Sequence, residues 1–317
     1  MNRRDVLKLG TAAFAGGVTL SLLGPVAIAD TVVQVAAAQR FKIGDIVVTA
    51  LSDGHIMLDP ALFSGITPDE FQAALRAAYL APGSYRGSVN AFVVDTGSKV
   101  FLIDSGTGAA LGPALGRLER NLIAAGYQPS AISALLTTHL HPDHIGGSHR
   151  EGKPVFDKAE FLVSQADHGF WSDAGIRAKA PAEAQMFFDL AVTAVKAYGD
   201  RLRLVSGEAE AVAGITAVPL PGHTPGHTGY RVTSGKDTLL IWGDIIHAGP
   251  VQFARPDVTL SFDVDQPLAA KTRKAVLEQV ARDRVMIAGA HIPFPGVGHV
   301  EAAGAGYRFV PAEWDYL

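Results

Sequence analysis

Four apolar segments of this chain are each followed closely by histidine or aspartate, and this pattern limits the folds that the chain can adopt. The segments are residues 133–137, 215–220, 238–242 and 285–288, followed respectively by a cluster at 139–144, His223, Asp244 and His291. Short apolar runs bounded by turn residues are typical of buried strands. Because ligand sites in open α/β sheets lie at the carboxyl ends of strands, the pattern predicts a fold that gathers these side chains at one sheet edge.

The first of these groups is TTHLHPDHIGG at residues 137–147, in which His139, His141, Asp143 and His144 fall within six positions. On extended backbone the side chains of residues i and i+2 share one face, so His139 and His141 point the same way. The chain turns at the following proline and brings the next two side chains around the same volume. Three protein ligands and an open position define a catalytic zinc site, so these four with more elsewhere are enough for two ions. The alternative, seven unrelated surface or core residues, does not explain their order.

The residue composition narrows the chemistry of such a site. The 317-residue chain has no cysteine, which excludes disulfides and thiolate zinc sites, so any metal must be bound by histidine and carboxylate. These ligands suit two Zn²⁺ ions, and they are also compatible with Mn²⁺, Co²⁺ or Fe²⁺. The formal net charge of −4 argues against a nucleic-acid partner.

The chain after the first 29 residues is interpreted as a single domain, residues 30–317, with mixed strands and helices and no repeat or linker. Further strands are predicted at 46–51, 89–94, 99–103, 160–163 and 229–233. Helices are predicted where apolar residues recur at three-and-four spacing, over 68–79, 111–125, 181–197 and 266–282. Residues 30–40 are predicted to be a flexible lead.

Residues 1–29 are predicted to be a targeting signal. Arg3 and Arg4 precede an apolar run of small residues that ends in Ala27-Ile28-Ala29, an A-x-A cleavage pattern. This arrangement indicates a twin-arginine-type signal peptide and a periplasmic or secreted protein. The alternative is an uncleaved N-terminal anchor, although Gly and Pro interrupt the run and it is short for a membrane span. After signal cleavage no membrane contact is expected, because no other stretch is long and apolar enough to span a bilayer.

The motif H-x-H-x-D-H, followed by a distant His, Asp and His in that order, resembles the metallo-β-lactamase superfamily. The stretch FLIDSGTG at 101–108 is similar to the turn that precedes the histidine motif in that superfamily. Longer stretches, among them PGHTPGHTGY at 221–230 and AGAHIPFPGVGHV at 288–300, resemble the branch of methyl parathion hydrolase and the dihydrocoumarin-hydrolysing lactonases. The resemblance implies an α/β fold, the αββα sandwich, in which two mixed β-sheets pack face to face with helices outside.

The same resemblance implies how the ligands divide between two divalent metal ions. One ion is bound by His139, His141 and His223, the other by Asp143, His144 and His291, and Asp244 bridges them. Two such ions share a water and lower its pKa, so that a metal-bound hydroxide is available near neutral pH. Asp143 or Asp244 is expected to orient this nucleophile or relay its proton, and the sequence does not separate these roles from ligation. Asp104 is a candidate to hold a histidine tautomer, with a purely structural turn role as the alternative.

Four residues outside the motif bear on the substrate pocket, namely Leu111, Trp171, Phe187 and His247. Trp171 and Phe187 lie in segments that resemble the pocket-forming region of the family and are expected to form its aromatic wall, with core packing as the alternative. His247 lies three residues after Asp244 and is expected near the metals. Leu111 stands where the phosphotriester hydrolases have an aromatic residue, and His247 where they have an aliphatic one. Structural or surface roles are expected for His55, His149, His168, His227 and His299.

These observations favour a dinuclear metallohydrolase with a small-molecule substrate, which opens aromatic lactones or aryl esters and hydrolyses phosphotriesters as a secondary activity. One alternative is a dedicated organophosphate hydrolase of the methyl parathion type, and another is a non-catalytic periplasmic metal-binding protein. A β-lactamase is disfavoured because the common variants of that site carry a cysteine ligand. The resemblance also implies a homodimer.

Overall fold

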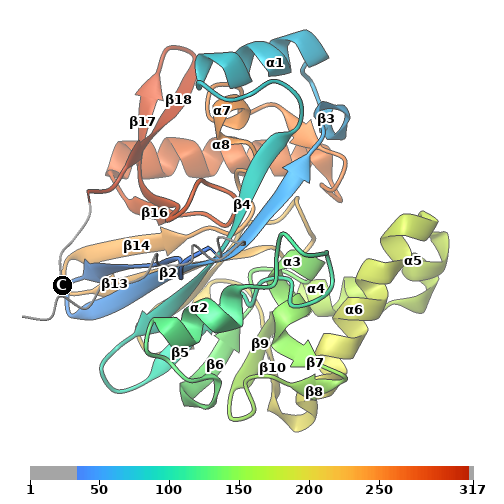
Figure 1. Cartoon of the computed structure of the whole chain (residues 1–317), viewed down its shortest axis with the longest axis vertical. Helices are drawn as coiled ribbons and strands as arrows, with labels where there is room; N and C mark the ends of the chain where they lie inside the picture. Colours follow the sequence, from blue (N-terminus) through green and yellow to red (C-terminus); the bar gives the residue numbers. More distant parts are fainter. Residues whose placement is uncertain (1–33, 314–317) are drawn as a thin grey trace, which may run out of the picture. The chain divides into compact units, whose positions relative to one another are not determined.

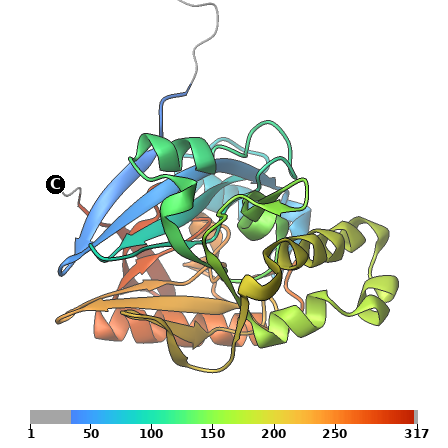
Figure 2. The same cartoon turned by 90° about the horizontal axis from the view of Figure 1, so that it is seen from below.

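The computed structural model describes residues 34–313, and residues 36–313 belong to one compact unit. Two seven-stranded β-sheets make up its centre, with helices on the outer side of each (Figure 1). In the view of Figure 2, α2 (Leu118–Ala124) covers the sheet that contains the N-terminal strands, and α8 (Gln266–Asp283) covers the other sheet. The predicted αββα sandwich of two mixed sheets is confirmed.

The first sheet is built from the N-terminal two thirds of the chain. Its strands, in spatial order, are β1 (Ala38–Ile43), β2 (Ile46–Leu58), β4 (Tyr85–Asp95), β5 (Val100–Ile103), β6 (Ile132–Leu136), β9 (Glu160–Ser164) and β10 (Leu202–Val205). From β1 to β5 the neighbouring strands are antiparallel, whereas β5, β6, β9 and β10 are parallel. The carboxyl ends of these parallel strands lie at one edge, and the histidine motif begins there.

The second sheet is built from strands of the C-terminal third of the chain. In spatial order they are β11 (Ala209–Val212), β12 (Ile215–Pro219), β13 (Thr228–Ser234), β14 (Asp237–Ile241), β16 (Met286–Ala288), β17 (Val297–Ala303) and β18 (Gly306–Pro311). Strands β14 and β16 are parallel, and the other neighbouring pairs are antiparallel. Because β12, β14 and β16 run in the same direction, the residues that follow them share one edge of this sheet.

The core follows from the alternation of side chains along each strand. In β4, Phe92 and Val94 pack with Tyr230 of the second sheet in the space between the sheets. Ala91 and Val93 of the same strand pack in a different cluster, together with residues of α2 and of α6 (Ala182–Tyr198). Each side chain of this size contributes roughly 1.5–3 kcal/mol when fully buried, so the two sheets are held together mainly by apolar contact.

The other elements are short and lie in the segments between the strands of the two sheets. They are the helices α1 (Pro68–Ala77), α3 (Pro142–Ile145), α4 (Gln165–Trp171), α5 (Ala174–Lys179) and α7 (Gly249–Gln252), the strand pairs β3 (Phe63–Ser64) with β15 (Thr259–Leu260) and β7 (His149–Arg150) with β8 (Lys153–Pro154), and 3-10 turns at Pro60–Leu62, Pro129–Ala131, Gly146–Ser148 and Gly199–Arg201. At the start of α1, the N–H of Glu70 donates to Oγ1 of Thr67 at 3.2 Å, and the Glu70 carboxylate accepts from the N–H of Thr67 at 2.7 Å. This capping box satisfies two N–H groups that the helix leaves free.

The predicted helix over 111–125 is wrong in its first half, because α2 begins at Leu118. Gly112 and Gly116 have φ angles of 95° and 76°, in a region that an α-helix excludes. A Cβ atom on Gly116 would lie 2.2 Å from the carbonyl oxygen of Gly108, so this approach requires glycine. The segment that carries Leu111 is therefore a loop.

The predicted flexible lead over 30–40 is wrong at its end, since β1 starts at Ala38 and residues 38–40 pair with residues 49–51. Strands β10, β11, β17 and β18 were not predicted, because none of them is a continuous apolar run. The predicted signal peptide, residues 1–29, lies outside the described residues. Within residues 34–313, the helices are all too short or too polar to cross a membrane.

Candidate metal centre

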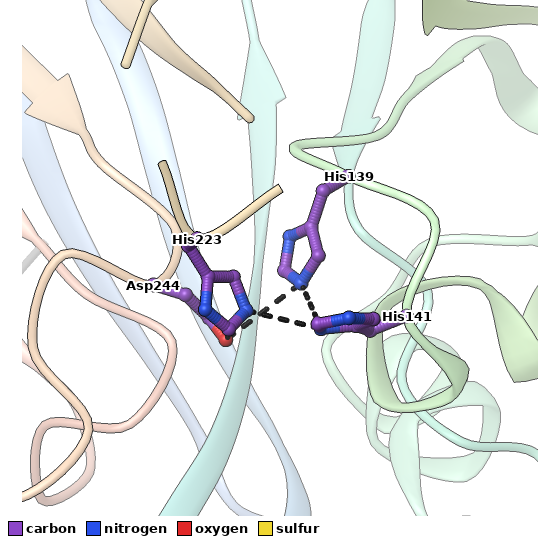
Figure 3. A group of neighbouring side chains, drawn as sticks. All are labelled: His139, His141, His223 and Asp244. Atoms are coloured by element: carbon purple, nitrogen blue, oxygen red, sulfur yellow. Dashed lines mark hydrogen bonds and ion pairs between the residues drawn. The ribbon is translucent and has the colours of Figure 1, made fainter. Parts of the chain in front are cut away.

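Seven side chains meet where the carboxyl ends of strands from the two sheets lie close together. They are His139 and His141 after β6, Asp143 and His144 in α3, His223 after β12, Asp244 after β14 and His291 after β16. Figure 3 shows four of these side chains pointing toward one another, with His139 and His141 on one loop and His223 and Asp244 on two others. The structure thus brings together all the residues that the sequence analysis selected as metal ligands.

The first group consists of His139, His141, His223 and Asp244. Nδ1 of His141 lies 2.9 Å from Nε2 of His139 and 3.0 Å from Nε2 of His223. Oδ2 of Asp244 lies 3.7 Å from Nε2 of His139 and 3.3 Å from Nε2 of His223. Four ligands in a tetrahedron, each about 2.0–2.1 Å from a zinc ion, are about 3.3–3.4 Å apart. The spacing of this group therefore fits one zinc-sized ion.

The second group consists of Asp143, His144 and His291. Oδ2 of Asp143 lies 3.5 Å from Nε2 of His144 and 3.4 Å from Nε2 of His291. Asp244 reaches this group as well, with Oδ1 3.2 Å from Nε2 of His144 and Oδ2 3.1 Å from Nε2 of His291. One carboxylate that faces both groups has the arrangement expected of a ligand shared by two ions.

Two buried atoms support the fit of cations to these groups. Nε2 of His144 and Oδ1 of Asp244 have no hydrogen-bond partner among the described residues. A buried polar atom without a partner destabilises a folded protein, so such atoms are rare. A divalent cation takes a lone pair from each of them, and the donor set of imidazole and carboxylate suits such an ion.

Outer hydrogen bonds fix which nitrogen an imidazole presents to the centre. Nδ1 of His223 donates to Oδ1 of Asp263 at 2.8 Å, and Nδ1 of His291 donates to the carbonyl oxygen of Ser88 at 2.7 Å. With the hydrogen on Nδ1, the lone pair of Nε2 remains directed at the centre. These partners come from β4 and from the loop before α8, far from the histidines in sequence.

Asp104 has both of the roles that the sequence analysis considered for it. Its Oδ2 accepts from Nδ1 of His144 at 2.8 Å, which holds that ring as the other partners hold theirs. Its Oδ1 accepts from the N–H of Thr138 at 2.8 Å, and its own backbone has a φ of 61°. The same carboxylate therefore shapes the turn after β5 and orients a ligand of the second group.

Charges within the site move the pKa values of its members in opposite directions. Burial acts against the charged form of Asp244, but the imidazoles around it hold its pKa well below the usual value. Burial also acts against protonation of His223, yet Asp244 and Asp263 raise its pKa to about 9. Burial, and then the neighbouring His144, lower the pKa of His139 well below its usual value. Metal binding must displace the protons that such histidines hold in the metal-free protein.

His227 lies beside the first group and supports it through the backbone. Its Nδ1 donates to the carbonyl oxygen of Leu220 at 2.9 Å, and its Nε2 accepts from the N–H of Asp244 at 3.0 Å. Burial, followed by the charge of His223, lowers the pKa of His227 to about 3, so the ring is neutral. Because both nitrogens are used, the ring fixes the backbone of Asp244 and does not supply a ligand.

A cavity of about 390 Å³ opens over the two groups and is lined by Asp143, Asp244 and His291. Its apolar wall comes from Met57, Leu58, Leu111, Leu115, Phe187 and Phe262. Of the four predicted pocket residues, Leu111, Phe187 and His247 line this cavity.

Trp171, the fourth predicted pocket residue, packs against His141 of the first group and does not line this cavity. It is 4% exposed, and its ring lies edge-on to His141 with centroids 5.2 Å apart. It lines a neighbouring cavity of about 380 Å³, together with Phe187 and Phe262. Phe187 and Phe262 therefore stand between the two cavities, whereas Trp171 belongs to the second one.

His247 is the predicted pocket residue that lies closest to the ligands. Its Nε2 lies 3.0 Å from Oδ2 of Asp244, and its ring stacks on His291 with centroids 5.1 Å apart. Nδ1 of His247 is buried with no hydrogen-bond partner among the described residues. Burial lowers the pKa of His247 to about 4, despite the nearby carboxylate. His247, Asp244 and His291 also have the spacing of an ion-binding group, so the ring lies in contact with the centre.

Two further cavity residues, His55 and Phe262, were not assigned to the site from the sequence. His55 comes from β2 and was expected to have a structural or surface role. Phe262 is 39% exposed and lies between β15 and α8. No local pattern marks either residue, because they reach the cavity from segments that contain no ligand.

Comparison with known proteins agrees with the fold. Residues 84–291 match the Metallo-beta-lactamase superfamily. A solved structure, the hydrolase AbOPH of the beta lactamase superfamily, is 33% identical with a TM-score of 0.83, over 89% of this chain and 100% of that chain. AidC, a dizinc quorum-quenching lactonase solved in complex with a homoserine product, is 27% identical with a TM-score of 0.83, over 88% of this chain and 99% of that chain.

Two curated relatives are N-acyl homoserine lactonases. The one from Bacillus cereus is 22% identical over 175 residues, which are 55% of this chain and 62% of the relative. The one from a Bacillus species is 24% identical over 120 residues, which are 38% of this chain and 40% of the relative. The chain thus spans less than two thirds of either relative. Because the superfamily match covers more than half of the chain and AbOPH is similar over its whole length, this chain belongs to the metallo-beta-lactamase superfamily.

Proposed function

We propose that this protein is a dinuclear metal-dependent hydrolase that opens aromatic lactones or aryl esters. The observation that carries the proposal is the meeting of two ligand groups at Asp244, in the floor of a cavity with apolar walls. Two divalent ions, for which Zn²⁺ is the best fit, would be held there by these residues and would supply Lewis-acid polarisation of a carbonyl oxygen and a water of lowered pKa.

The protein's own groups then position the substrate and handle protons. Asp143 and Asp244 both line the cavity, and their side chains are 14% and 3% exposed. Asp143, the more accessible of the two, accepts a proton from a water that enters the cavity. Asp244, which faces both groups, keeps them at a fixed separation. The ring of His247, which lines the cavity beside Asp244, is placed to contact the substrate next to the ligand groups.

The wall of the cavity away from the ligand groups supports a flat apolar substrate. Phe187 and Phe262 offer aromatic surface there, and the neighbouring leucines extend the apolar wall. AidC and the two Bacillus relatives are lactonases, which supports a cyclic ester as the substrate class. Hydrolysis of phosphotriesters is proposed as a secondary activity of the same centre.

A substrate panel on metal-loaded protein tests this proposal. Zinc-loaded and manganese-loaded protein are assayed with dihydrocoumarin, aryl acetates, N-acyl homoserine lactones and methyl parathion, with the chelated protein as the control. We expect the highest kcat/KM for an aromatic lactone or an aryl ester. A far higher value for methyl parathion would instead identify a dedicated organophosphate hydrolase. Protein that binds two ions and turns over none of the four classes would be a non-catalytic metal-binding protein.

We also propose that the chain is exported by a twin-arginine signal, that it is periplasmic or secreted and that it forms a homodimer. The arginine pair and the A-x-A pattern of the first 29 residues support export. Cell fractionation with Arg3→Lys and Arg4→Lys together tests the signal, because a twin-arginine substrate should then stay in the cytoplasm. Light scattering of the purified protein tests the dimer, and a monomeric mass would contradict it.

A further inference from the structure

Asp167 is a buried carboxylate that belongs to neither ligand group. It lies in the first turn of α4 and is 0% exposed. A buried carboxylate is destabilising unless its oxygens are hydrogen-bonded, so the partners of Asp167 show what it holds.

Both oxygens of Asp167 accept hydrogen bonds from loops that carry ligands of the first group. Oδ2 accepts from the N–H of Leu140 at 3.1 Å, and Leu140 lies between His139 and His141 in the chain. Oδ1 accepts from the N–H of Gly226 at 2.6 Å, three residues after His223. One side chain therefore joins the two loops that supply all three imidazoles of the first group.

The approach of the second loop is close enough to require glycine. A Cβ atom on Gly226 would lie 2.4 Å from the backbone nitrogen of Asp167 and 2.4 Å from Oγ of Ser164. The backbone of the 223–226 loop is thus packed directly against the start of α4. The separation of the two loops is set at this contact.

The separation of the two loops sets the distance between two ligand atoms of the first group. Nδ1 of His141 and Nε2 of His223 lie 3.0 Å apart, and they come from the two loops that Asp167 joins. The second group has other supports, since Asp104 holds His144 and the carbonyl oxygen of Ser88 holds His291.

We propose that Asp167 is a positioning residue for the first ion, which holds the 139–141 and 223–226 loops at the separation that this ion needs. The competing explanation is that Asp167 stabilises the fold as a whole. The two explanations differ in what they predict for the second ion.

Asp167→Asn separates the two explanations. The asparagine amide has nearly the same shape as the carboxylate, but it has an NH₂ group where the carboxylate has its second oxygen. This NH₂ group cannot accept a hydrogen bond from a backbone N–H, so one of the two loop contacts is lost. Outer residues of this kind typically change metal affinity by about 10- to 100-fold. We therefore expect Zn²⁺ to bind the first group about 10- to 100-fold more weakly, with the second group unchanged.

Zn²⁺ binding to the two groups is measured separately in two variants, each of which keeps only one ligand group intact. His291→Ala removes a ligand of the second group, and His223→Ala removes a ligand of the first. Zn²⁺ affinity of the full chain is measured by competition with a chromophoric chelator, with and without Asp167→Asn. The variant should weaken Zn²⁺ binding in the His291→Ala background and leave it unchanged in the His223→Ala background.

Asp53→Asn is the matched control. Asp53 is equally buried and accepts hydrogen bonds from Thr107, Gly116 and Leu118, so it holds a loop that carries no metal ligand. The Asp53→Asn variant should lower the melting temperature of the metal-free protein without changing the Zn²⁺ affinity of either ligand group. Equal weakening of both ions by Asp167→Asn, or no weakening, would overturn the proposal.

A second variant covers the case in which Asp167→Asn does not fold. Gly226→Ala disturbs the same contact from the other side and should again weaken the first ion alone. If neither variant folds, the contact serves the whole fold and the proposal is wrong. The outcome is separate from that of the proposed function, because Zn²⁺ affinity is measured without a substrate.

Discussion

His247 contacts the aspartate that the two ligand groups share, with its Nε2 atom 3.0 Å from Oδ2 of Asp244. The same imidazole stacks on His291 and lines the substrate cavity. A residue outside the sequence motif is therefore in contact with both the centre and the space above it. This position makes His247 the residue through which substrate preference and the ligand groups are coupled.

Replacing His247 by leucine should lower kcat/KM for aromatic lactones and aryl esters by about 10- to 100-fold. A hydrogen bond that involves a charged group contributes about 1.5–3 kcal/mol, which corresponds to this range. Methyl parathion hydrolysis should fall less, because the phosphotriester hydrolases that this chain resembles have an aliphatic residue at this position. Kinetics on both substrate classes, with metal content measured in parallel, checks the prediction. Loss of an ion from the variant would instead show that His247 is itself a ligand.

Asp244→Asn should remove more activity than any other single change at the centre. The amide cannot act as an anionic ligand to both groups, so less than two equivalents of metal should remain bound. The lost stabilisation of the transition state amounts to at least about 4 kcal/mol, or about 10³-fold in kcat/KM. Asp265→Asn is the control, because that carboxylate caps α8 by accepting from the N–H of Leu268 at 2.9 Å and lies outside the centre. Full metal content with unchanged turnover in Asp244→Asn would contradict the shared-ligand role.

The metal-free protein should become less stable as the pH rises from about 6.5 to about 9. The pKa of His223 is raised to about 9, so its stabilising protonation is complete below the unfolded value of about 6.5 and is lost as the pH rises through 9. His144 and His291 also have raised pKa values, chiefly because the carboxylates near them outweigh burial, and they act in the same direction. Thermal unfolding of chelated protein across this interval is the measurement, and a rising melting temperature would disprove the prediction.

Zinc affinity should change in the opposite sense over the same interval. A ligand histidine must lose its proton before it binds the ion, so affinity increases as His223 and its neighbours deprotonate. The zinc-loaded protein should therefore lack the loss of stability that the chelated protein shows. Proton release on zinc addition, measured by calorimetry in buffers of different ionisation enthalpy, should decrease toward about pH 9.

Phe187→Ala should raise KM for aryl substrates by about 10-fold and change kcat less. Phe187 lines both cavities, so its removal takes away aromatic contact and joins spaces of about 390 and 380 Å³. Bulkier aryl esters should become better substrates relative to small ones. Met186→Ala is the control on the same helix, since that side chain is 42% exposed. An equal fall of kcat for all substrates would place Phe187 in the chemistry rather than in the pocket.

Much of the architecture was visible in the sequence because strands leave a local signature. All nine predicted strands correspond to strands of the two sheets, and three of the four predicted helices agree with the structure to within a few residues. The fourth failed at Gly112 and Gly116, whose left-handed backbone breaks the three-and-four pattern. Edge strands such as β10 were missed because they are short and none of their residues is fully buried in an apolar run.

The sequence by itself determined the seven-residue ligand set, because each member follows an apolar strand and its residue type limits its chemistry. The tertiary structure alone decided which residues support that set and which surround the substrate. Asp263 reaches His223 across 40 positions, and Asp167 reaches Gly226 across 59. The tertiary structure also places Trp171 in the second cavity, and it places His55 and Phe262 at the cavity over the ligand groups. Such contacts depend on how distant segments pack. The residues that make them belong to no local sequence pattern from which the contacts could be predicted.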